Sequence, residues 1–417
     1  MAFKGAKVKP LGKEKRHVRA AGPSWLNLKF KILLVSLFLS LLNARAQSSP
    51  IADSSKTPSK NSLKGDDSLS AQGRGSVGPV SVSMQAVPFA YNEDYIDVRG
   101  VGDTGWTESD PQHDKNEFSA VLRSFDPGGL LLQGDLNFLN WESSVGPSCQ
   151  KWNQVQFPFL SPPAALKDAL DFGFNLFGVS NNHAEDCAKF DDKTSGVMRT
   201  RYELSTLAKG QEMLWHGIGM SHEISKVSTR IFQLKGKKIK VAFAAVSFLN
   251  WRTHSTSRGE GHYHGEDILQ SMQRSDAKIK ILSVHTQSTL EQGKSYASRF
   301  IKEAGGDIVF AQGEHKWGEV EAIEKTNGGK GIVFHGLGNF SHRGCVSNHK
   351  NILARVLLKK ETLELAQIQI IPFSNLFQGE LKLHSAKNGL PSANFDWKRA
   401  VLQADRNVSL AFSNFSP

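Results

Sequence analysis

The residues best suited to chemistry in this sequence share a position, because each lies at or near the end of a short apolar run of the kind that forms a buried strand. The candidate metal ligands are Asp103, Glu142, Asn182, His285 and His315. Mixed carboxylate, amide and imidazole groups favour borderline divalent metals such as Mn, Zn or Fe over calcium, which prefers oxygen ligands alone. Two such ions about 3.5–4 Å apart can hold a phosphoryl group and generate hydroxide near neutral pH. The pattern therefore predicts a centre of one or two divalent ions per chain.

The most specific local signal is the run Ser180-Asn181-Asn182-His183, which follows the apolar stretch Phe174–Val179. An amide is a neutral oxygen ligand for a metal, and the adjacent imidazole has a pKa close to neutral pH. We therefore predict that Asn182 binds metal and that His183 is catalytic, donating a proton to the leaving oxygen. Each of the other motifs is weak alone, because an Asp after a Gly often caps a turn and a single strand-end His is usually a structural residue.

Short apolar runs alternate with stretches of helical pattern from residue 95 onward. The expected strands are Ile96–Val101, Leu130–Leu132, Phe174–Val179, Leu214–Ile218, Ile239–Phe248, Ile279–Val284, Ile308–Ala311, Ile332–Gly336 and Leu353–Leu358. The expected helices are Pro163–Asp171, Val197–Ala208 and Ser288–Ala304. Continuous apolar strands that alternate with helices predict an α/β fold whose sheets are covered by helices. In such folds ligands bind at the carboxyl ends of the strands, which is where the candidate residues fall.

The order of these motifs resembles that of the CapA-like poly-γ-glutamate capsule-biosynthesis proteins, a branch of the calcineurin-like metallophosphoesterases. The matching residues are Gly102-Asp103, Asn140-Trp141-Glu142, Asn181-Asn182-His183 with Asp186, His285, Gly313-Glu314-His315 and Gly336-Leu337-Gly338-Asn339-Phe340. The resemblance covers about two-thirds of the chain. It implies a four-layer α-β-β-α sandwich, a metal-dependent phosphoesterase-like hydrolase, and a role in making or exporting an anionic envelope polymer. The implied partners are that polymer or a phosphoester substrate, together with the envelope-polymer export machinery.

Two departures from the family pattern concern the metal site. Thr286-Gln287 follows His285 where the family has Trp-Gly, and Trp317 stands where the family has the second His of Gly-x-His-x-His. This leaves the second metal ion open, and the candidates to replace the missing ligand are His254, His262, His264 and His342. An alternative function follows from the same departure, namely a non-catalytic polymer-binding or assembly protein that keeps the fold with an incomplete metal site.

The basic charge of the chain is concentrated at its N-terminus. The formal net charge is +11, and residues 1–46 carry ten Lys or Arg and one acid, Glu14, a net +9 that leaves about +2 for the remainder. A nearly neutral remainder argues against nucleic acid as a partner. The apolar run Ile32–Leu42 has 11 residues, too few to span a membrane, and Ala44-Arg45-Ala46 follows it as a cleavage site. We therefore predict that residues 1–46 are a signal peptide and that the body is exported to the periplasm or the cell surface, with membrane contact only through an uncleaved leader.

Composition divides the rest of the chain into three parts. Residues 47–92 are rich in Ser and Gly, and we expect them to form a flexible linker because they hold too little apolar surface to fold. We expect residues 93–375 to form the metallophosphoesterase-fold domain and residues 376–417 to form a C-terminal extension.

The sequence contains three cysteines, Cys149, Cys187 and Cys345. An exported protein can form and keep disulfides, since the compartments outside the cytoplasm are oxidising. Cys149 and Cys187 both follow strand-end motifs, so we predict a disulfide between them. None of the three has the spacing of a zinc site, and the third cysteine is then left over as a thiol.

Overall fold

The computed structural model of the chain describes residues 92–106, 118–126, 128–129, 131–146, 150–151, 159–189, 196–249, 265–287, 290–342, 351–373, 401–402 and 409–412. All of them lie in one compact unit, Val77–Pro417. The predicted signal peptide and all but the last residue of the predicted linker lie outside this described part. Among the described helices, none is both long enough and apolar enough to cross a membrane.

The first sheet has eight strands, and its central part is parallel. The strand order is β19 (Ser409–Phe412), β17 (Leu365–Phe373), β16 (Asn351–Lys359), β1 (Tyr95–Thr104), β2 (Leu136–Trp141), β6 (Leu176–Gly178) and β8 (Leu214–His216), with β15 (Asn339–Ser341) also paired to β1. Strands β1, β2, β6, β8 and β15 run parallel, so their carboxyl ends lie at one edge. Alternate residues of a strand point to opposite faces, and Ile96 and Val98 of β1 therefore enter the same core.

The second sheet has seven strands and also has a parallel centre. The order is β18 (Val401–Leu402), β13 (Val320–Glu324), β14 (Lys330–Phe334), β12 (Ile308–Gln312), β11 (Ile279–Gln287), β10 (Lys237–Leu249) and β9 (Ser228–Leu234). Strands β10, β11, β12 and β14 are parallel. Two small pairs complete the strands: β3 (Ser144–Val145) with β5 (Leu160–Ser161), and β4 (Gln150–Lys151) with β7 (Cys187–Lys189).

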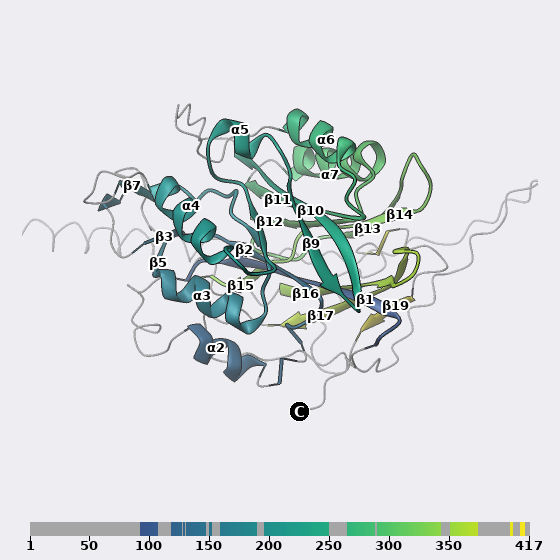
Figure 1. Cartoon of the computed structure of the whole chain (residues 1–417), viewed down its shortest axis with the longest axis horizontal. Coiled ribbons are helices and arrows are strands. Elements are labelled where there is room, and N and C mark those ends of the chain that lie inside the picture. Colours follow the sequence, from purple (N-terminus) through teal and green to yellow (C-terminus); the bar gives the residue numbers. More distant parts are fainter. Residues whose placement is uncertain are drawn as a thin grey trace, which may run out of the picture. The chain divides into compact units, whose positions relative to one another are not determined.

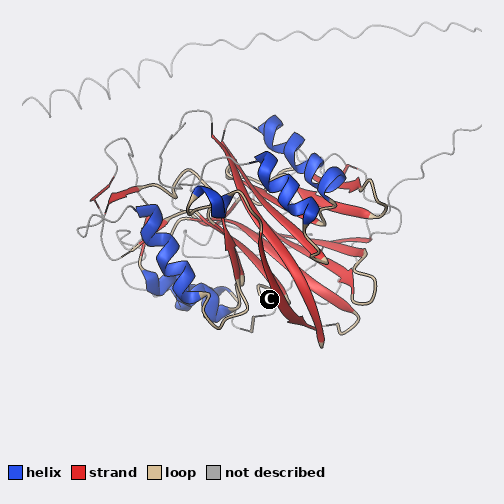
Figure 2. Cartoon of the chain, turned by 45° about the horizontal axis from the view of Figure 1, so that its top comes forward, coloured by secondary structure: helices blue, strands red, loops and turns tan. Residues whose placement is uncertain are grey.

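The helices cover the outer faces of the two sheets (Figures 1 and 2). The helices are α2 (Phe118–Phe125), α3 (Pro163–Phe172), α4 (Gly196–Leu207), α5 (Ser221–Ile224), α6 (Gly265–Arg274) and α7 (Leu290–Ala304). Buried side chains of α2, α3 and α4 share a core with the first sheet, and those of α6 and α7 share a core with the second. A third core contains residues of both sheets and lies between them. The arrangement confirms the predicted four-layer α-β-β-α sandwich.

Aromatic side chains fill the core between the sheets. Phe138 of the first sheet stacks on Phe310 of the second with ring centroids 4.9 Å apart, and Phe310 stacks in turn on Phe334 at 5.8 Å. All three side chains are fully buried, and burial of each such ring stabilises the fold by about 1.5–3 kcal/mol. These aromatic contacts pack the two sheets against each other, and this packing positions the polar residues at the strand ends of one sheet relative to those of the other.

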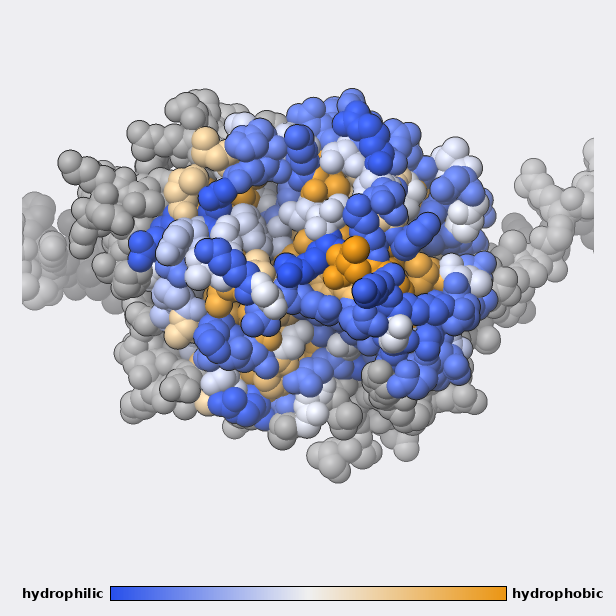
Figure 3. Space-filling view, in the orientation of Figure 1, coloured by the Kyte–Doolittle hydropathy of each residue, from blue (hydrophilic) through white to orange (hydrophobic). Residues whose placement is uncertain are grey.

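The face of the domain seen in Figure 3 is mainly hydrophilic, with a small hydrophobic patch near its centre. Among the described residues, the exposed large hydrophobic side chains are Tyr202, Met220 and Ile231. Single exposed apolar residues of this kind are normal on a protein surface and do not by themselves indicate an interface.

The predicted helices agree closely with the observed ones, whereas one predicted strand is wrong. Helix α3 begins at Pro163 and ends before Gly173, whose φ of 119° lies in the left-handed region that favours glycine. The run Leu130–Leu132 was expected to be a strand, but Leu131 and Leu132 lie in a turn, and the strand β2 begins four residues later. The apolar pattern of β2 is interrupted by asparagines whose amides are satisfied by other parts of the fold.

Candidate metal centre

The candidate residues meet where the carboxyl ends of the parallel strands of both sheets come together. Asp103 comes from β1, Glu142 follows β2, and His285 lies in β11 of the second sheet. Asp103 and His285 were expected after their strands, but the structure places both inside them, near the carboxyl end. A hydrogen bond from the backbone amide of Gly313 to Oδ2 of Asp103, 3.1 Å long, joins the two sheets at this point.

Asp103 is positioned by a close approach of two backbones. The register of β1 against β2 shifts between Val101 and Asp103, and the amide of Asp103 donates to the carbonyl of Gly338 at 2.9 Å. Gly102 allows this approach, because a Cβ there would lie 1.9 Å from the same carbonyl oxygen. The side-chain amide of Asn140 donates to Oδ1 of Asp103 at 2.7 Å. The carboxylate is therefore held from several sides although it is fully buried.

The charge states of Asp103 and its neighbours favour cation binding. Burial alone would raise the pKa of Asp103, but the hydrogen bond and positive charge of His315, with the charges of His285 and His342, hold the pKa well below its usual value. Burial lowers the pKa of His285 to about 4, against the opposing charge of Asp103. The contact with His315 thus favours the ionised form of Asp103, whereas burial favours the neutral form of His285.

His285 lies close to three other predicted ligands. Its Nε2 atom lies 2.8 Å from Oδ1 of Asn182 and 3.7 Å from Oε1 of Glu142, and its Nδ1 atom lies 3.9 Å from Oδ1 of Asp103. Asp103, Glu142 and His285 each offer one ligand atom, and these three atoms lie within 4.8 Å of one another. All three side chains are buried. Their donor set fits a borderline divalent metal.

His315 follows β12 in a loop, with a φ of 53° that is unusual for a residue other than glycine. Its Nδ1 atom lies 3.0 Å from Oδ2 of Asp103 and 2.8 Å from Oδ1 of Asn339, which is the register partner of Asp103. Burial opposes the charged form of His315, but the hydrogen bond to Asp103 raises its pKa above the usual value. The left-handed backbone thus turns the imidazole back toward the carboxylate.

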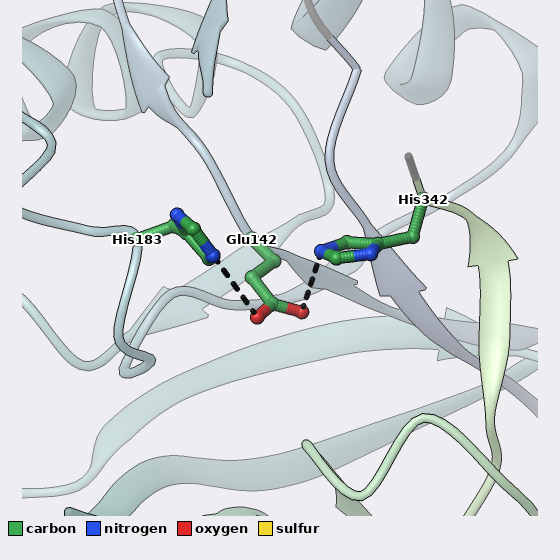
Figure 4. Close-up of side chains that lie close together, drawn as sticks. All are labelled: Glu142, His183 and His342. Carbon is green, nitrogen blue, oxygen red and sulfur yellow. Dashed lines mark ion pairs between the residues drawn. The ribbon is translucent and has the colours of Figure 1, made fainter. Parts of the chain in front are cut away.

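Glu142 lies between two further histidines (Figure 4). Its carboxylate is fully buried, and the Nε2 atoms of His183 and His342 lie 4.0 Å and 3.7 Å from its two oxygens. The other ring nitrogen of His183, Nδ1, lies 2.6 Å from Oδ2 of Asp186. This contact directs Nε2 of His183 into the site. The predicted proton-donor role of His183 stays a prediction.

The structure brings all five predicted ligands and His183 into one site. Of the four histidines considered as replacements for the missing ligand, His342 lies in the site, whereas His254, His262 and His264 lie outside the described residues. His342 comes directly after β15, whose parallel pairing with β1 could not be read from the sequence. Its position two residues beyond the Gly-Leu-Gly-Asn-Phe motif is the signal that could have selected it.

Trp317 does not point to a vacant ligand position. Its side chain is 4% exposed, belongs to the core between the sheets, and its backbone forms a bridge with Leu337. The departure from the family pattern at this position thus adds apolar packing below the site.

Cys187 forms a disulfide, as predicted for this residue. Its predicted partner, Cys149, lies outside the described residues, so the pairing itself stays a prediction. The short strand β4, which begins at Gln150, pairs with β7, which begins at Cys187. The disulfide is therefore attached to the segment that follows the Asn-Asn-His run and Asp186.

Comparison with known proteins identifies a family and two distant structures. The profile of the family described as bacterial capsule synthesis protein PGA_cap matches residues 101–343. A novel phosphatase from Mycoplasma pneumoniae aligns at 10% identity with a TM-score of 0.40, over 74% of this chain and 99% of that one. A hypothetical protein from Thermus thermophilus aligns at 10% identity with a TM-score of 0.39, over 65% of this chain and 96% of that one. No curated protein matches the sequence.

Proposed function

We propose that this chain, which belongs to the family of bacterial capsule synthesis proteins PGA_cap, is an exported metal-dependent phosphoesterase-like hydrolase. Its role would lie in the biosynthesis of poly-γ-glutamate capsule or of a related envelope polymer. The observation that carries the proposal is the buried group of Asp103, Glu142 and His285, whose ligand atoms lie within 4.8 Å of one another at the meeting of the two sheets. Burying carboxylates is costly unless they are paired, so a cation bound between Asp103 and Glu142 would stabilise this group.

The residues that would hold an ion are Asp103, Glu142 and His285, with Asn182 and His315 in contact with them. A divalent ion at such a site polarises a phosphoryl oxygen and lowers the pKa of bound water. The chain itself supplies the orientation. The amides of Asn140 and Gly313 hold the carboxylate of Asp103, and Asn182 contacts the ring of His285.

A histidine that transfers a proton is best oriented when its second ring nitrogen is held by a hydrogen-bond partner. The contact between His183 Nδ1 and Asp186 Oδ2 provides this, and the backbone amide of His183 also donates to Oδ1 of Asn181 at 3.1 Å. Phe159 packs edge-on against the ring of His183 at 4.4 Å, which limits its rotation. Such a fixed ring can present Nε2 to an ion or to a phosphoester oxygen without reorganisation.

One observation favours an alternative function. The family pattern has a ligand where Trp317 is packed in the core, so a chain that binds a capsule polymer without hydrolysing a phosphoester is the second candidate. In this case the metal would stabilise a binding surface, and no turnover would accompany its binding.

The test is hydrolysis of a generic phosphodiester, bis-p-nitrophenyl phosphate, by metal-free protein to which Mn²⁺, Zn²⁺ or Fe²⁺ is restored. We expect turnover that requires the metal and is abolished in Asp103→Ala. His335→Ala is the matched control, since His335 is also a buried histidine but is not one of the candidate ligands. Its Nε2 atom lies 3.0 Å from Oε2 of Glu321. Metal binding without turnover on any phosphoester would support the polymer-binding alternative, and turnover that survives in Asp103→Ala would refute the assignment of the site.

A further inference from the structure

Two neighbouring hollows lie at the end of the second sheet opposite the candidate metal centre. Their volumes are about 700 and 490 Å³, and they share Lys278, Asp307 and Lys325 as lining residues. Lys278 comes directly before β11 and Asp307 directly before β12, so both stand at the amino ends of these strands. Seven residues separate Lys278 from His285, and a strand rises by about 3.3 Å per residue, so the hollows lie about 23 Å from the metal centre along β11.

The two hollows together follow several elements of the fold. The larger one is bounded by the turn between β13 and β14 and by the turn between β16 and β17. The smaller one is bounded by the same β13–β14 turn and by the carboxyl ends of α6 and α7. A ligand that occupied both hollows would therefore be extended and would contact both sheets.

Lysine is the commonest charged residue in the lining of these hollows. The described lining residues include six lysines and four acids, and none of them is an arginine or an aromatic residue. The lysines are Lys278, Lys280, Lys302, Lys325, Lys330 and Lys359. Because the body of the chain beyond residue 46 carries a net charge of only about +2, this group is a local concentration of positive charge.

Each of the four acids already has a cationic partner. The pairs are Asp307 with Lys325, Glu324 with Lys330, Glu364 with Lys359 and Glu303 with Arg299. Within the described part of the chain, the other three lysines, Lys278, Lys280 and Lys302, form no ion pair. The hollows thus contain three positive charges that no carboxylate of the lining neutralises.

The environment of Lys280 shows how close these charges lie to one another. Its Nζ atom donates to the carbonyl oxygen of Ala304 at 3.1 Å, so the side chain is held at the end of α7. Burial lowers the pKa of Lys280, and the charge of Lys325 lowers it further, against the attraction of Asp307. An anion bound among these lysines would reduce their mutual repulsion.

The residue types of the lining indicate which class of anion fits. Single-stranded nucleic acids are bound by aromatic side chains that stack on the bases, and the described lining has none. Planar anions that need a fixed orientation are usually bound by the rigid fork of arginine, whereas lysine is a point charge on a flexible stem. Flexible lysines along an extended depression suit a flexible chain that carries a negative charge on each repeating unit.

We propose that the two hollows bind a linear polyanion, with carboxylate or phosphate groups on its repeating units, through Lys278, Lys280 and Lys302. Several weak contacts made by one polymer act together, so the affinity for the polymer exceeds that for its single unit. The site uses none of the candidate metal ligands, and binding there does not depend on the proposed hydrolase activity.

The test is acetylation of the lysines of the full chain in EDTA, with and without a polyanion, read at each lysine by mass spectrometry. A local readout is needed because residues 1–46 carry a net charge of +9 and attract polyanions themselves. At about 10 times its dissociation constant, poly-γ-glutamate or linear polyphosphate should slow the acetylation of Lys278 and Lys302 by about 10-fold. Lys209 and Lys226, which are exposed and line neither hollow, should react at an unchanged rate.

The polymer that protects Lys278 and Lys302 identifies the charged group that the site prefers. Absence of protection by both polymers, or equal protection of Lys209 and Lys226, would overturn the inference. Stronger protection by a single-stranded oligonucleotide than by either polymer would also overturn it. Protection in EDTA by a chain that shows no phosphoester turnover with restored metal would leave this site in place and remove only the hydrolase.

Charge reversal tests the same lysines by their effect on a neighbour. In the double variant Lys278→Glu/Lys302→Glu, the dissociation constant measured from protection of Lys359 should rise by about 10-fold or more, because two attractions become repulsions. Lys209→Glu/Lys226→Glu is the matched control, since it changes the net charge by the same amount at exposed positions away from the hollows. An unchanged dissociation constant in the first variant, or an equal rise in the control, would refute the assignment of the site.

Discussion

Replacing Gly102 with alanine tests whether the close approach of two backbones positions the metal-binding carboxylate. The new Cβ would lie 1.9 Å from the carbonyl oxygen of Gly338, and real Cβ atoms essentially never come nearer than 3.0 Å, so the two backbones must separate by about 1.1 Å, which is 3.0 minus 1.9. That carbonyl also accepts the amide of Asp103 at 2.9 Å. The movement lengthens this hydrogen bond to about 4 Å and breaks it.

The expected effect is larger on metal binding and rate than on folding. Overpacking costs about 1–3 kcal/mol and a lost hydrogen bond about 1 kcal/mol, so the free energy of unfolding should fall by about 2–4 kcal/mol. A displacement of about 1 Å at a reacting centre lowers a rate by about 100-fold. Since Asp103 moves with Gly102, the affinity for a divalent ion should fall as well, while the chain remains folded.

Gly100→Ala is the matched control, because it adds the same methyl group to the same strand. Its Cβ would lie 2.5 Å from the ring of Phe310 in the core, away from the contact between Gly102 and Gly338. We expect this variant to lose stability to urea and to keep its Mn²⁺ affinity. If Gly102→Ala and Gly100→Ala lost stability equally and both bound Mn²⁺ like the wild type, the approach of the two backbones would have no role in placing Asp103.

Three further results are expected. Burial would raise the pKa of Asp97, but Arg99 and Arg355 hold it below its usual value, so its contribution to stability is present above about pH 4 and is lost as the pH falls through the lower folded pKa. Asp97→Asn should therefore lower the free energy of unfolding at pH 7 by about 3–5 kcal/mol and make this free energy less dependent on pH in the acid range. A loss below about 1 kcal/mol would show that the two arginines do not need this charge. Mn²⁺ at about 100 times its dissociation constant should stabilise the chain by about 2.7 kcal/mol, which corresponds to a rise of roughly 5–10 °C in Tm. Glu142→Gln should abolish this rise in Tm, and an equal rise in that variant would show that the ion binds elsewhere. Exported material should begin at or near Gln47 on N-terminal sequencing, and an intact leader on cytoplasmic protein would contradict the predicted export.

Local patterns in the sequence were sufficient for the helices α3, α4 and α7 and for the uniformly apolar strands, whereas α2, α5 and α6 were not predicted. The predicted helix Pro163–Asp171 differs from α3 by one residue, since a proline starts it and Gly173 ends it. Strand β2 was missed because Asn137 interrupts its apolar pattern. The amide of Asn137 donates to the carbonyls of Gly134 and Gly173, and the second of these contacts exists only in the folded chain. A polar residue in a buried strand is stable when such contacts satisfy it, and these contacts lie beyond the reach of a local pattern.

The sequence by itself determined which residue types follow its apolar runs, and the order of these motifs predicted that Asp103, Glu142 and His285 would belong to one site. In an α/β fold ligands bind at the carboxyl ends of the strands, which is where such residues are expected. Only the tertiary structure decided how these residues divide into ligand groups. The pairing of β15 with β1 brings His342 to Glu142, and the core between the sheets takes up Trp317. Distances between side chains depend on strand register and sheet packing, which are set by contacts between segments far apart in the chain.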